Sequence, residues 1–289
     1  MKAPAAKSAH QKDLPAAIAE LHRAFQRAPR SCAAAFALAC AWLEAGEPDR
    51  AIDLLRGLTS GKGMYRNRAA AKLRDAEKMK GMARFPEAYV RHLFDQFSAT
   101  YDHAMVHDLG YRAPQILRSF AEMLMIGVDG PVDILDLGCG TGLAGEAFKS
   151  LARCLDGVDL SPLMIKRAKG RGIYRELTVA DIESFLENSR RKYDLLIAAD
   201  AIVYLGDLAR LFRAARAKLK PEGSFLFTAE TKAEPGFSLG PKRRYRHSND
   251  YLRASAESAG FACIGILDCS PRSDAGEPVE AVAVALHRV

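Results

Sequence analysis

The stretch Val132-Asp-Ile-Leu-Asp-Leu-Gly-Cys-Gly-Thr-Gly142 decides the fold of this 289-residue chain. Its apolar first half predicts a buried strand, and its glycines predict a tight turn into a helix that starts near Leu143. The free N–H groups at such a helix start, together with glycines that allow close backbone approach, predict a ligand site. Gly140–Gly145 also satisfies the G-x-G-x-x-G dinucleotide fingerprint, so the glycines alone leave two cofactor classes open.

Carboxylates follow this strand and the next two. Asp136 stands two residues before Gly138, where a carboxylate suits an ammonium and a sulfonium but repels a pyrophosphate. Asp159 follows Gly140 by 19 residues and can accept hydrogen bonds from both ribose hydroxyls, which either cofactor class needs. Asp181, after the third strand, can accept a hydrogen bond from an adenine amino group. Together these positions favour an adenosyl sulfonium over a dinucleotide.

Beyond position 86 the chain alternates helical runs with short, continuously apolar strand runs, as in a parallel sheet covered by helices on both faces. The last two strands follow a helix near Asn249–Ala259 and are joined by a polar turn at 270–278, which predicts an antiparallel hairpin at the sheet edge. The predicted fold is therefore α/β, with a mostly parallel, seven-stranded sheet. The expected strands are Val132–Leu137, Cys154–Asp159, Tyr174–Val179, Leu195–Ala199, Ser224–Thr228, Cys263–Cys269 and Val279–Leu286.

Five motifs in consecutive order carry a family resemblance: DLGCGTG (136–142), GVDLSPLMIKRAK (157–169), VADIESF (179–185), YDLLIAADAIVYL (193–205) and LKPEGSFLFTAE (219–230). Over about 200 residues the chain resembles class I S-adenosylmethionine-dependent methyltransferases, which share a Rossmann-like sheet. The resemblance implies S-adenosyl-L-methionine as cofactor and S-adenosyl-L-homocysteine as product. It does not specify the methyl acceptor.

The resemblance also implies roles for single residues. Asp136 is expected to bind the cofactor's ammonium, Asp159 the ribose, and Asp181 the adenine amino group. Asp200 is expected to close the far side of the cofactor. An alternative reading of Asp159 and Asp181 is that each is a helix N-cap. The expected cofactor-site residues are Tyr101, Asp136, Gly138, Cys139, Gly140, Gly142, Leu143, Asp159, Leu160, Met164, Asp181, Ile182 and Asp200.

Phe94-Asp-Gln-Phe-Ser-Ala-Thr-Tyr-Asp102 resembles the FDxxAxxYD segment of quinone C-methyltransferases and malonyl carrier-protein O-methyltransferases, with Ser98 where alanine is usual. In those families a helix here covers the cofactor cleft, which implies that Phe94 meets the substrate and Tyr101 the cofactor. The alternative is simple core packing of an amphipathic helix. With the N-terminal repeat and Gly110–Pro114, the whole chain resembles a bacterial group of tetratricopeptide-containing methyltransferases.

Methyl transfer from a sulfonium needs alignment, exclusion of water and a deprotonated nucleophile. A general base is expected on the helices that cover the cleft, beyond the fourth strand, or in a lid at 231–249. The histidines at positions 103 and 107 lack a third ligand at motif spacing, so no metal site is predicted. The candidate bases are His103, His107, Tyr204 and His247.

The segment Lys232–His247 combines cations and aromatic residues, which favours a small-molecule acceptor that carries a carboxylate or phosphate. The alternative is a solvated surface loop. The fourth strand ends in Ala199-Asp-Ala-Ile202 and not in the Asn-Pro-Pro-Tyr of methyltransferases that act on adenine or glutamine amino groups. O-, C- and other N-methylation therefore stay open. The expected acceptor-site residues are Phe94, Tyr204, Phe237, Arg244 and Tyr245.

Residues 13–80 are helical in character and contain an internal repeat. The triplet Ala17, Ile18 and Leu21 recurs 34 residues later as Ala51, Ile52 and Leu55. This shift is the period of a tetratricopeptide unit, and one and a half units cannot form a solenoid. We expect a helical cap on the catalytic domain at 86–289, whose own cap helices occupy 86–125. A groove for a protein partner and self-association are the alternatives.

Composition excludes several classes of function. Apolar residues at 49% and charged residues at 27% are typical of a globular protein. The net charge of +7 is diffuse and lacks interleaved aromatic residues, so a nucleic-acid partner is not expected. No apolar run approaches the length of a membrane span, and the six cysteines show no metal or disulfide spacing, which predicts a cytoplasmic protein.

Three classes of function stay in view. A small-molecule methyltransferase is favoured. A protein or RNA methyltransferase that docks through the repeat is second, and a non-catalytic cofactor-binding assembly protein is third. An oxidoreductase is a distant fourth.

Overall fold

The computed structural model describes residues 14–44, 47–61, 63–80, 82, 84–85, 87–240, 243–274 and 276–289. The chain divides into two compact units, one formed by Met1–Met82 with Ser238–Arg244 and the other by Ala83–Phe237 with Tyr245–Val289. The expected domain limits Asp13 and Pro86, the turn residue Gly46 and the cation Lys242 lie outside the described residues.

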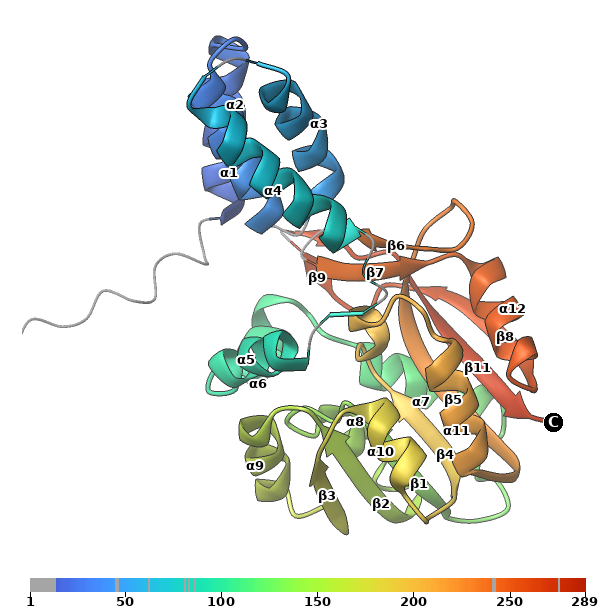
Figure 1. Cartoon of the computed structure of the whole chain (residues 1–289). Coiled ribbons are helices and arrows are strands. Elements are labelled where there is room, and N and C mark those ends of the chain that lie inside the picture. The colour runs from blue at the N-terminus through green and yellow to red at the C-terminus, as the bar shows by residue number, and fades with distance from the viewer. Residues whose placement is uncertain are drawn as a thin grey trace, which may run out of the picture. The chain divides into compact units, whose positions relative to one another are not determined.

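Packed helices make up the first unit, and Figure 1 shows them in blue to cyan: α1 (Leu14–Arg27), α2 (Cys32–Glu44), α3 (Pro48–Thr59) and α4 (Tyr65–Lys80). Helix α2 packs on both of its sequence neighbours. Its Leu38 shares a buried cluster with Ile18 of α1, and its Ala39 shares another with Ile52 and Leu55 of α3. Ile18 and Ile52, which the 34-residue shift relates, thus both contribute to clusters that include α2.

The second unit is built on a sheet whose main strands are β1 (Val132–Leu137), β2 (Ala152–Asp159), β3 (Glu176–Val179), β4 (Tyr193–Ala198), β5 (Leu219–Thr231), β8 (Phe261–Cys269) and β11 (Ala281–Arg288). Their order is β3-β2-β1-β4-β5-β11-β8 (Figure 1). Strands β1 to β5 pair in parallel, whereas β11 is antiparallel to both β5 and β8. The seven predicted strands and the antiparallel C-terminal pair are confirmed.

Helices cover both faces of this sheet: α7 (Ala113–Met123), α8 (Leu143–Phe148), α9 (Pro162–Gly170), α10 (Ile182–Asn188), α11 (Ala209–Lys218) and α12 (Asn249–Ser258). In β1, Leu135 and Leu137 join a buried cluster with α10, α11 and α12, while Ile134 joins the cluster on α7 and α8. Both faces of the strand are buried, so its sequence is continuously apolar and does not alternate.

Three short helical segments precede α7, and one follows β4: α5 (Glu87–Phe97), α6 (Tyr101–His103), the π-helix η1 (Ala104–Asp108) and the 3-10 helix η2 (Ile202–Tyr204). We call α5, α6 and η1 the cap helices, because α5 and α6 supply residues over the cavity described below.

The segment expected to form a lid differs from the prediction. Its described part contains β6 (Phe237–Gly240) and β7 (Arg244–His247), which pair with each other. The end of β7 also pairs in parallel with the end of β5, and Tyr245 and His247 on it are buried. This part of the segment therefore extends the sheet. A second short ladder, β9 (Ser273–Asp274) with β10 (Glu277–Pro278), lies in the turn before β11.

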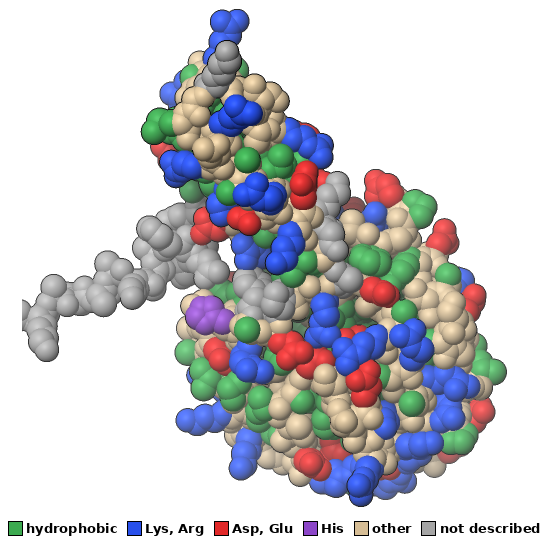
Figure 2. All heavy atoms as spheres, viewed as in Figure 1, with side chains coloured by type: hydrophobic (Ala, Val, Ile, Leu, Met, Phe, Trp, Pro, Cys, Tyr) green, Lys and Arg blue, Asp and Glu red, His purple; other side chains and the backbone are tan. Residues whose placement is uncertain are grey.

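Charged side chains of both signs are mixed on the surface in view (Figure 2). Figure 2 shows Lys and Arg side chains scattered over the face in view and interspersed with Asp and Glu. On that face the described residues form no continuous basic groove, of the kind that tracks a nucleic-acid backbone. None of the described helices combines the length and apolar character that a bilayer span requires.

Candidate functional site

A cavity opens where β1, β2, β3 and β4 end, at the sheet edge where open α/β folds bind ligands. It comprises about 720 Å³, including the part that is open to solvent. Ten residues singled out from the sequence line it: Phe94, Tyr101, Gly138, Gly140, Asp159, Leu160, Asp181, Ile182, Asp200 and Tyr204. Sequence reasoning missed several others, among them Arg84, Phe85, Glu87 and Val90.

The glycine turn forms the floor of the cavity. Gly138 has a φ of +69°, and a Cβ there would lie 2.6 Å from the Cβ of Ala201, so only glycine fits. A Cβ at Gly140 would meet no atom within 4 Å, which shows that this backbone faces open space. The backbone N–H groups of Gly138 and Cys139 donate to the carbonyl of Val158 at 2.8 and 3.0 Å and tie the turn to β2. The exposed backbone at Gly140 can therefore approach a ligand closely.

Asp159 organises the loops after β1 and β2. Its Oδ2 accepts the N–H of Gly140 at 2.9 Å, and its Oδ1 accepts the N–H of Ser161 at 2.8 Å. The N-cap of α9 is Ser161, whose hydroxyl accepts the N–H of Met164, so Asp159 is not the cap. Burial raises the pKa of Asp159 to about 6, although two backbone N–H groups oppose the shift.

Asp181 is the N-cap of α10, as the alternative reading supposed. Its Oδ1 accepts the N–H of Ser184 at 3.0 Å. Its Oδ2 accepts a hydrogen bond from Arg84 at 2.7 Å, and Arg84 also reaches Glu183 at 2.7 Å. Asp181 nevertheless lines the cavity together with Ile182, so capping and a place in the site coexist.

Asp136 does not line the cavity. It is fully buried, and its Oδ2 accepts the hydroxyl of Tyr174 at 2.7 Å, while its Oδ1 is buried without a partner. Burial raises the pKa of Asp136 to about 7. A Cβ at Gly145 would lie 2.2 Å from the Tyr174 hydroxyl oxygen, so the last glycine of the fingerprint makes room for Tyr174. Nothing in the motif pointed to Tyr174, which precedes β3.

Other residues expected at the cofactor lie beside the cavity or beneath it. Met164, expected on a face of the adenine, is fully buried in α9, because this residue faces inward from the first turn of the helix. Cys139 is also buried, which raises the pKa of its thiol. Leu143 packs against the buried cluster of Met105 and Tyr111. None of these residues is in the described lining, and neither is Gly142.

The cap helices are clamped to the loops that follow β1 and β2. Asp95 accepts the hydroxyl of Ser161 at 2.5 Å. Asp102 accepts hydrogen bonds from the Thr141 hydroxyl and from Arg171, the latter at 2.6 Å. The two acidic residues of the FDxxSxxYD segment thus hold its helices over the glycine turn.

The two aromatic residues of the same segment face the cavity. Phe94 makes edge contacts with Tyr101 and with Tyr204, at ring-centroid distances of 6.2 and 5.4 Å. All three rings line the cavity. They provide an apolar wall that could hold a flat ligand.

At the β4 end of the cavity, charged side chains come together from distant parts of the chain. Asp200, with a φ of +58°, accepts a hydrogen bond from Arg272 at 2.6 Å, and Arg272 also donates to Glu230 at 2.5 Å. The Tyr111 hydroxyl donates to the carbonyl of Ala199 at 3.2 Å, and burial raises the pKa of Tyr111 well above its usual value. Arg272 lies in a polar turn with no motif, so the sequence carried no signal for it.

Three of the four candidate bases do not reach the cavity. His103 and His107 are exposed on the cap helices, and their tilted rings lie 4.9 Å apart. His247 is fully buried between Phe237 and Tyr251, and its Nε2 lies 2.9 Å from the carbonyl of Gly206. Burial lowers the pKa of His247 to about 4. Of the four candidates, Tyr204 is the one in the described lining of the cavity.

Three of the expected acceptor-site residues are not in the described lining: Phe237, Arg244 and Tyr245. Tyr245 is 1% exposed and packs on Phe85, which itself lines the cavity. Phe237 packs on Tyr245, so both rings support the wall from behind. The physical reason is the two-residue period of β7, which turns Tyr245 and His247 inward.

The lining is acidic. Glu87, Asp159, Asp181 and Asp200 contribute carboxylates, whereas Arg84 is the cation in the described lining and is engaged by Asp181 and Glu183. Such a cavity attracts a cation and repels an anion.

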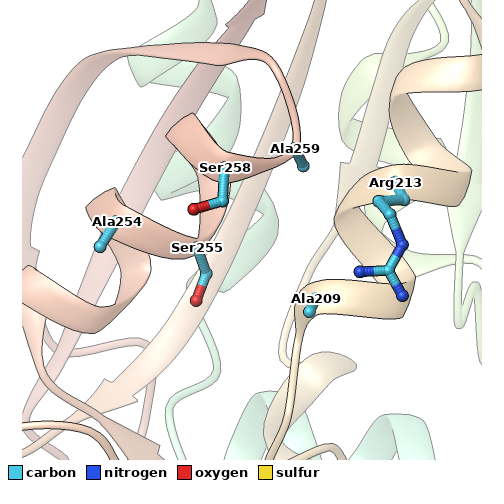
Figure 3. Close-up of a pocket in the computed structure, with 6 residues that line it drawn as sticks. All are labelled: Ala209, Arg213, Ala254, Ser255, Ser258 and Ala259. Carbon is cyan, nitrogen blue, oxygen red and sulfur yellow. The ribbon is translucent and has the colours of Figure 1, made fainter.

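A second depression lies between α11 and α12 (Figure 3). It is lined by Ala209, Arg213, Ala254, Ser255, Ser258 and Ala259. The described lining holds no carboxylate and no aromatic ring, and it lies away from the strand ends that carry the motifs. We therefore place the functional site in the cavity at the sheet edge.

Comparison with known proteins agrees with this geometry. Residues 134–223 match the family profile described as a methyltransferase domain. A ubiquinone biosynthesis O-methyltransferase of Coxiella burnetii is 28% identical over 153 residues, which cover 46% of this chain and 64% of the relative. The mitochondrial ubiquinone biosynthesis O-methyltransferase of Homo sapiens is 28% identical over 114 residues, 37% of this chain and 31% of that protein. The match thus spans less than two thirds of these curated relatives.

Solved structures share the fold. Magnesium protoporphyrin IX methyltransferase of Synechocystis PCC 6803, crystallised with bound SAH, superposes with a TM-score of 0.53 at 16% identity, covering 70% of this chain and 99% of that one. The 1,6-didemethyltoxoflavin-N1-methyltransferase of Burkholderia thailandensis gives 0.55 at 15% identity, covering 71% and 91%. The strand order, the glycine turn and these matches define a class I methyltransferase fold. Residues 134–223 thus match a methyltransferase domain, within a unit that has the fold of these solved methyltransferases.

Proposed function

We propose that the chain transfers a methyl group from S-adenosyl-L-methionine to a small-molecule acceptor and releases S-adenosyl-L-homocysteine. The observation that carries the proposal is the single cavity wall formed by Gly140, Asp159, Asp181 and Asp200, one from the end of each of four neighbouring strands. At Gly140 the backbone is open to a ligand, and Asp159, Asp181 and Asp200 contribute carboxylates at the ends of β2, β3 and β4. A pyrophosphate would meet repulsion here, whereas a cationic adenosyl ligand would not.

The residues present fit this cofactor. Asp159 receives two backbone N–H groups, and a carboxylate has lone pairs for further donors such as ribose hydroxyls. Asp181 and Ile182 would hold the adenine, and the backbone at Gly140 would lie against the ribose and methionine. When bound, the cofactor supplies an electrophilic methyl group on a sulfonium. The chain's own task is to align the acceptor, exclude water and hold charge.

The acceptor we propose is a small aromatic molecule with a hydroxyl nucleophile. The edge-packed rings of Phe94, Tyr101 and Tyr204 support a flat acceptor, and the names of the curated O-methyltransferases support a hydroxyl. The acidic lining argues against the anionic acceptor expected from the cations at 232–247, because Arg243 and Arg244 are not in the described lining. Tyr204, the candidate base in the described lining, would take the acceptor's proton in its phenolate form.

Calorimetry with S-adenosylhomocysteine, and separately with a nicotinamide dinucleotide, tests the cofactor. We expect binding of the first only, and binding of the dinucleotide alone would overturn the proposal. Incubation with labelled S-adenosylmethionine and a panel of catechols and phenols, followed by mass spectrometry, tests the acceptor. Methylation of protein or RNA in place of these compounds would favour a macromolecular acceptor. Cofactor binding with no methylation of either would favour an assembly role.

We further propose that the N-terminal helices form a tetratricopeptide-like module at 13–80, with the catalytic domain at 86–289. The related positions Ile18 and Ile52, both buried, support the repeat. Such a module could bind a protein partner or a second copy of the chain, and light scattering during size-exclusion chromatography would separate these cases from a simple cap. A cytoplasmic location is also a proposal, supported by the described cysteines, which are free.

A further inference from the structure

Asp200, Arg272 and Glu230 form a buried charged cluster at the β4 end of the cavity. Their side chains are 6%, 5% and 4% exposed, and Arg272 bonds both carboxylates through different nitrogens. The other oxygen of Glu230 lies 3.7 Å from Nε of the partly exposed Arg246. Buried ion pairs contribute little net stability relative to apolar packing, so their presence at a cavity wall calls for a functional reason.

The loop that carries Arg272 is held on both sides. The N–H of Arg112 donates to the carbonyl of Pro271 at 2.7 Å, and the N–H of Ser273 donates to the carbonyl of Leu109 at 2.8 Å. These bonds join the loop to the segment between the cap helices and α7. The two bonds therefore fix the position of the Arg272 guanidinium beside β4.

Asp200 is constrained as tightly. Its φ of +58° is uncommon for a residue other than glycine, and such strain persists only where the surroundings enforce it. The N–H of Asp200 donates to the Thr228 hydroxyl at 2.8 Å, while Arg272 holds Oδ2. Both the backbone and the carboxylate of Asp200 are therefore oriented by contacts from other strands and loops.

We propose that Arg272 is a positioning residue that holds the Asp200 carboxylate toward the sulfonium end of the cofactor, so that the site prefers S-adenosylmethionine over S-adenosylhomocysteine. The inference rests on the proposed function. Along the cavity, Asp181 and Asp159 would meet the adenosine, which the two molecules share, and the half-exposed Glu87 lies 3.7 Å from Arg84, the partner of Asp181. Asp200 at the opposite end is therefore the buried carboxylate that can distinguish the two molecules. Asp200, Glu230 and Arg272 together carry one net negative charge, which attracts a sulfonium and is indifferent to a neutral thioether. The preference would promote release of the product.

Calorimetric titration of the full chain with each of the two molecules tests this inference. The variants are Arg272→Met, Arg272→Lys, Asp200→Asn and the double variant Arg272→Met/Asp200→Asn. We expect Asp200→Asn to weaken S-adenosylmethionine by about tenfold and S-adenosylhomocysteine by less than about twofold. Arg272→Met should lower the ratio of the two affinities in the same direction by a smaller amount, because it removes the group that orients the Asp200 carboxylate and leaves the charge of Asp200 in place. The double variant should lose no more than Asp200→Asn, because Arg272 acts through Asp200. Arg272→Lys should be intermediate, since lysine lacks the planar fork.

Arg153→Met is the control for the loss of an arginine that is paired with two carboxylates outside the cavity. Arg153 also lies between two carboxylates, Asp133 and Asp194, but outside the cavity lining, so this change should leave the ratio of the two affinities unaltered. A lower unfolding temperature of the Arg272 variants with an unchanged ratio would show that Arg272 only stabilises the fold. Equal loss of affinity for both ligands would also overturn the inference. If the unaltered chain binds neither molecule, the proposed function fails first, and the inference fails with it.

Discussion

On the β2 side of the cavity, the groups that hold Asp159 stand near it in the sequence, whereas on the β4 side they come from far along the chain. Asp159 is bonded to residues 19 and 2 positions away, and Asp181 caps a helix through a residue 3 positions away. Arg272 is bonded to carboxylates 72 and 42 positions away. After the proposed function, we call the β2 and β3 side of the cavity the adenosine half and the β4 side the acceptor half. The adenosine half is largely local, apart from Arg84, which bonds Asp181 from 97 positions away, whereas the acceptor half is tertiary.

The contacts of Asp159 with Gly140 and Ser161, and of Asp181 with Ser184, form within single strand-loop-helix units or between neighbouring ones. Sequence changes elsewhere in the protein can therefore leave these contacts intact. The acceptor half depends on loops from three regions that meet only when the domain folds, so a change in any of them alters the acceptor site. Methyltransferases of one fold can in this way share a cofactor and differ in acceptor.

The largest expected effect concerns Asp136 and pH. Its folded pKa of about 7 exceeds the unfolded value of 3.8, so its contribution to stability is present below about pH 4 and is lost as pH rises through about 7. The loss amounts to at most about 4 kcal/mol. Asp136→Asn, which keeps an acceptor for Tyr174, should therefore be more stable than the unaltered chain at pH 8 and lose this advantage near pH 4, as measured by urea unfolding.

Asp133 provides the opposite control on the same strand. Hydrogen bonds from Arg153 and Lys220 hold the pKa of Asp133 well below its usual value, so its ionised form stabilises the fold. Asp133→Asn should destabilise the chain at pH 8. If Asp136→Asn also destabilised the chain at pH 8, the ionised form of the buried Asp136 would stabilise the fold. The predicted difference between Asp133 and Asp136 would then be wrong.

The next prediction concerns Asp159 in the adenosine half. Asp159→Ala removes the acceptor of the Gly140 and Ser161 N–H groups and of the expected ribose hydroxyls. We expect S-adenosylhomocysteine to bind more weakly by about 2 kcal/mol, the range for lost charge-assisted hydrogen bonds. Calorimetry should show no change for Asp268→Ala, an exposed carboxylate on β8. An unchanged affinity of Asp159→Ala would remove this residue from the site.

Asp102→Ala should have a smaller effect, because Asp102 is half exposed and solvent weakens its pair with Arg171. The change releases the cap helices from the glycine turn, so we expect the dissociation rate of S-adenosylhomocysteine to rise by about threefold to tenfold. Stopped-flow fluorescence would measure it. Asp108→Ala, also on the cap helices but exposed, is the control. Equal rates in the two variants would show that the clamp does not restrain the cleft.

The smallest effect is expected from His103→Ala/His107→Ala. Both rings are exposed and outside the cavity lining, so cofactor affinity should change by less than about twofold, and the pH dependence of methyl transfer should stay the same. A lost alkaline or acidic limb of the pH profile in this double variant would show that one of the two histidines takes part in proton transfer.

Many residues of the adenosine half could be predicted from the sequence alone. Gly138, Gly140, Asp159 and Asp181 line the cavity because each lies at the end of a strand or just after it, and parallel strands bring their carboxyl ends to one edge. Asp136 was misplaced for the opposite reason. It lies within β1, where the pleat turns its side chain toward Tyr174 and away from the cavity.

The positions of the side chains around the acceptor half could not be predicted from sequence patterns. His247 and Tyr245 carry side chains suited to chemistry, yet β7 buries them, since burial depends on the neighbouring strand and not on residue type. Arg272, by contrast, looked like part of a polar turn and proved to be buried.

The amino-acid sequence by itself determined the order of strands and helices, the glycine turn and the carboxylates that follow successive strands, because hydrophobic period and backbone preference act over a few residues. Only the tertiary structure decided which face of each element meets the cavity, how the cap helices are clamped, and which cation reaches Asp200. Those outcomes depend on contacts between segments that are far apart in the chain, and no local pattern encodes such contacts.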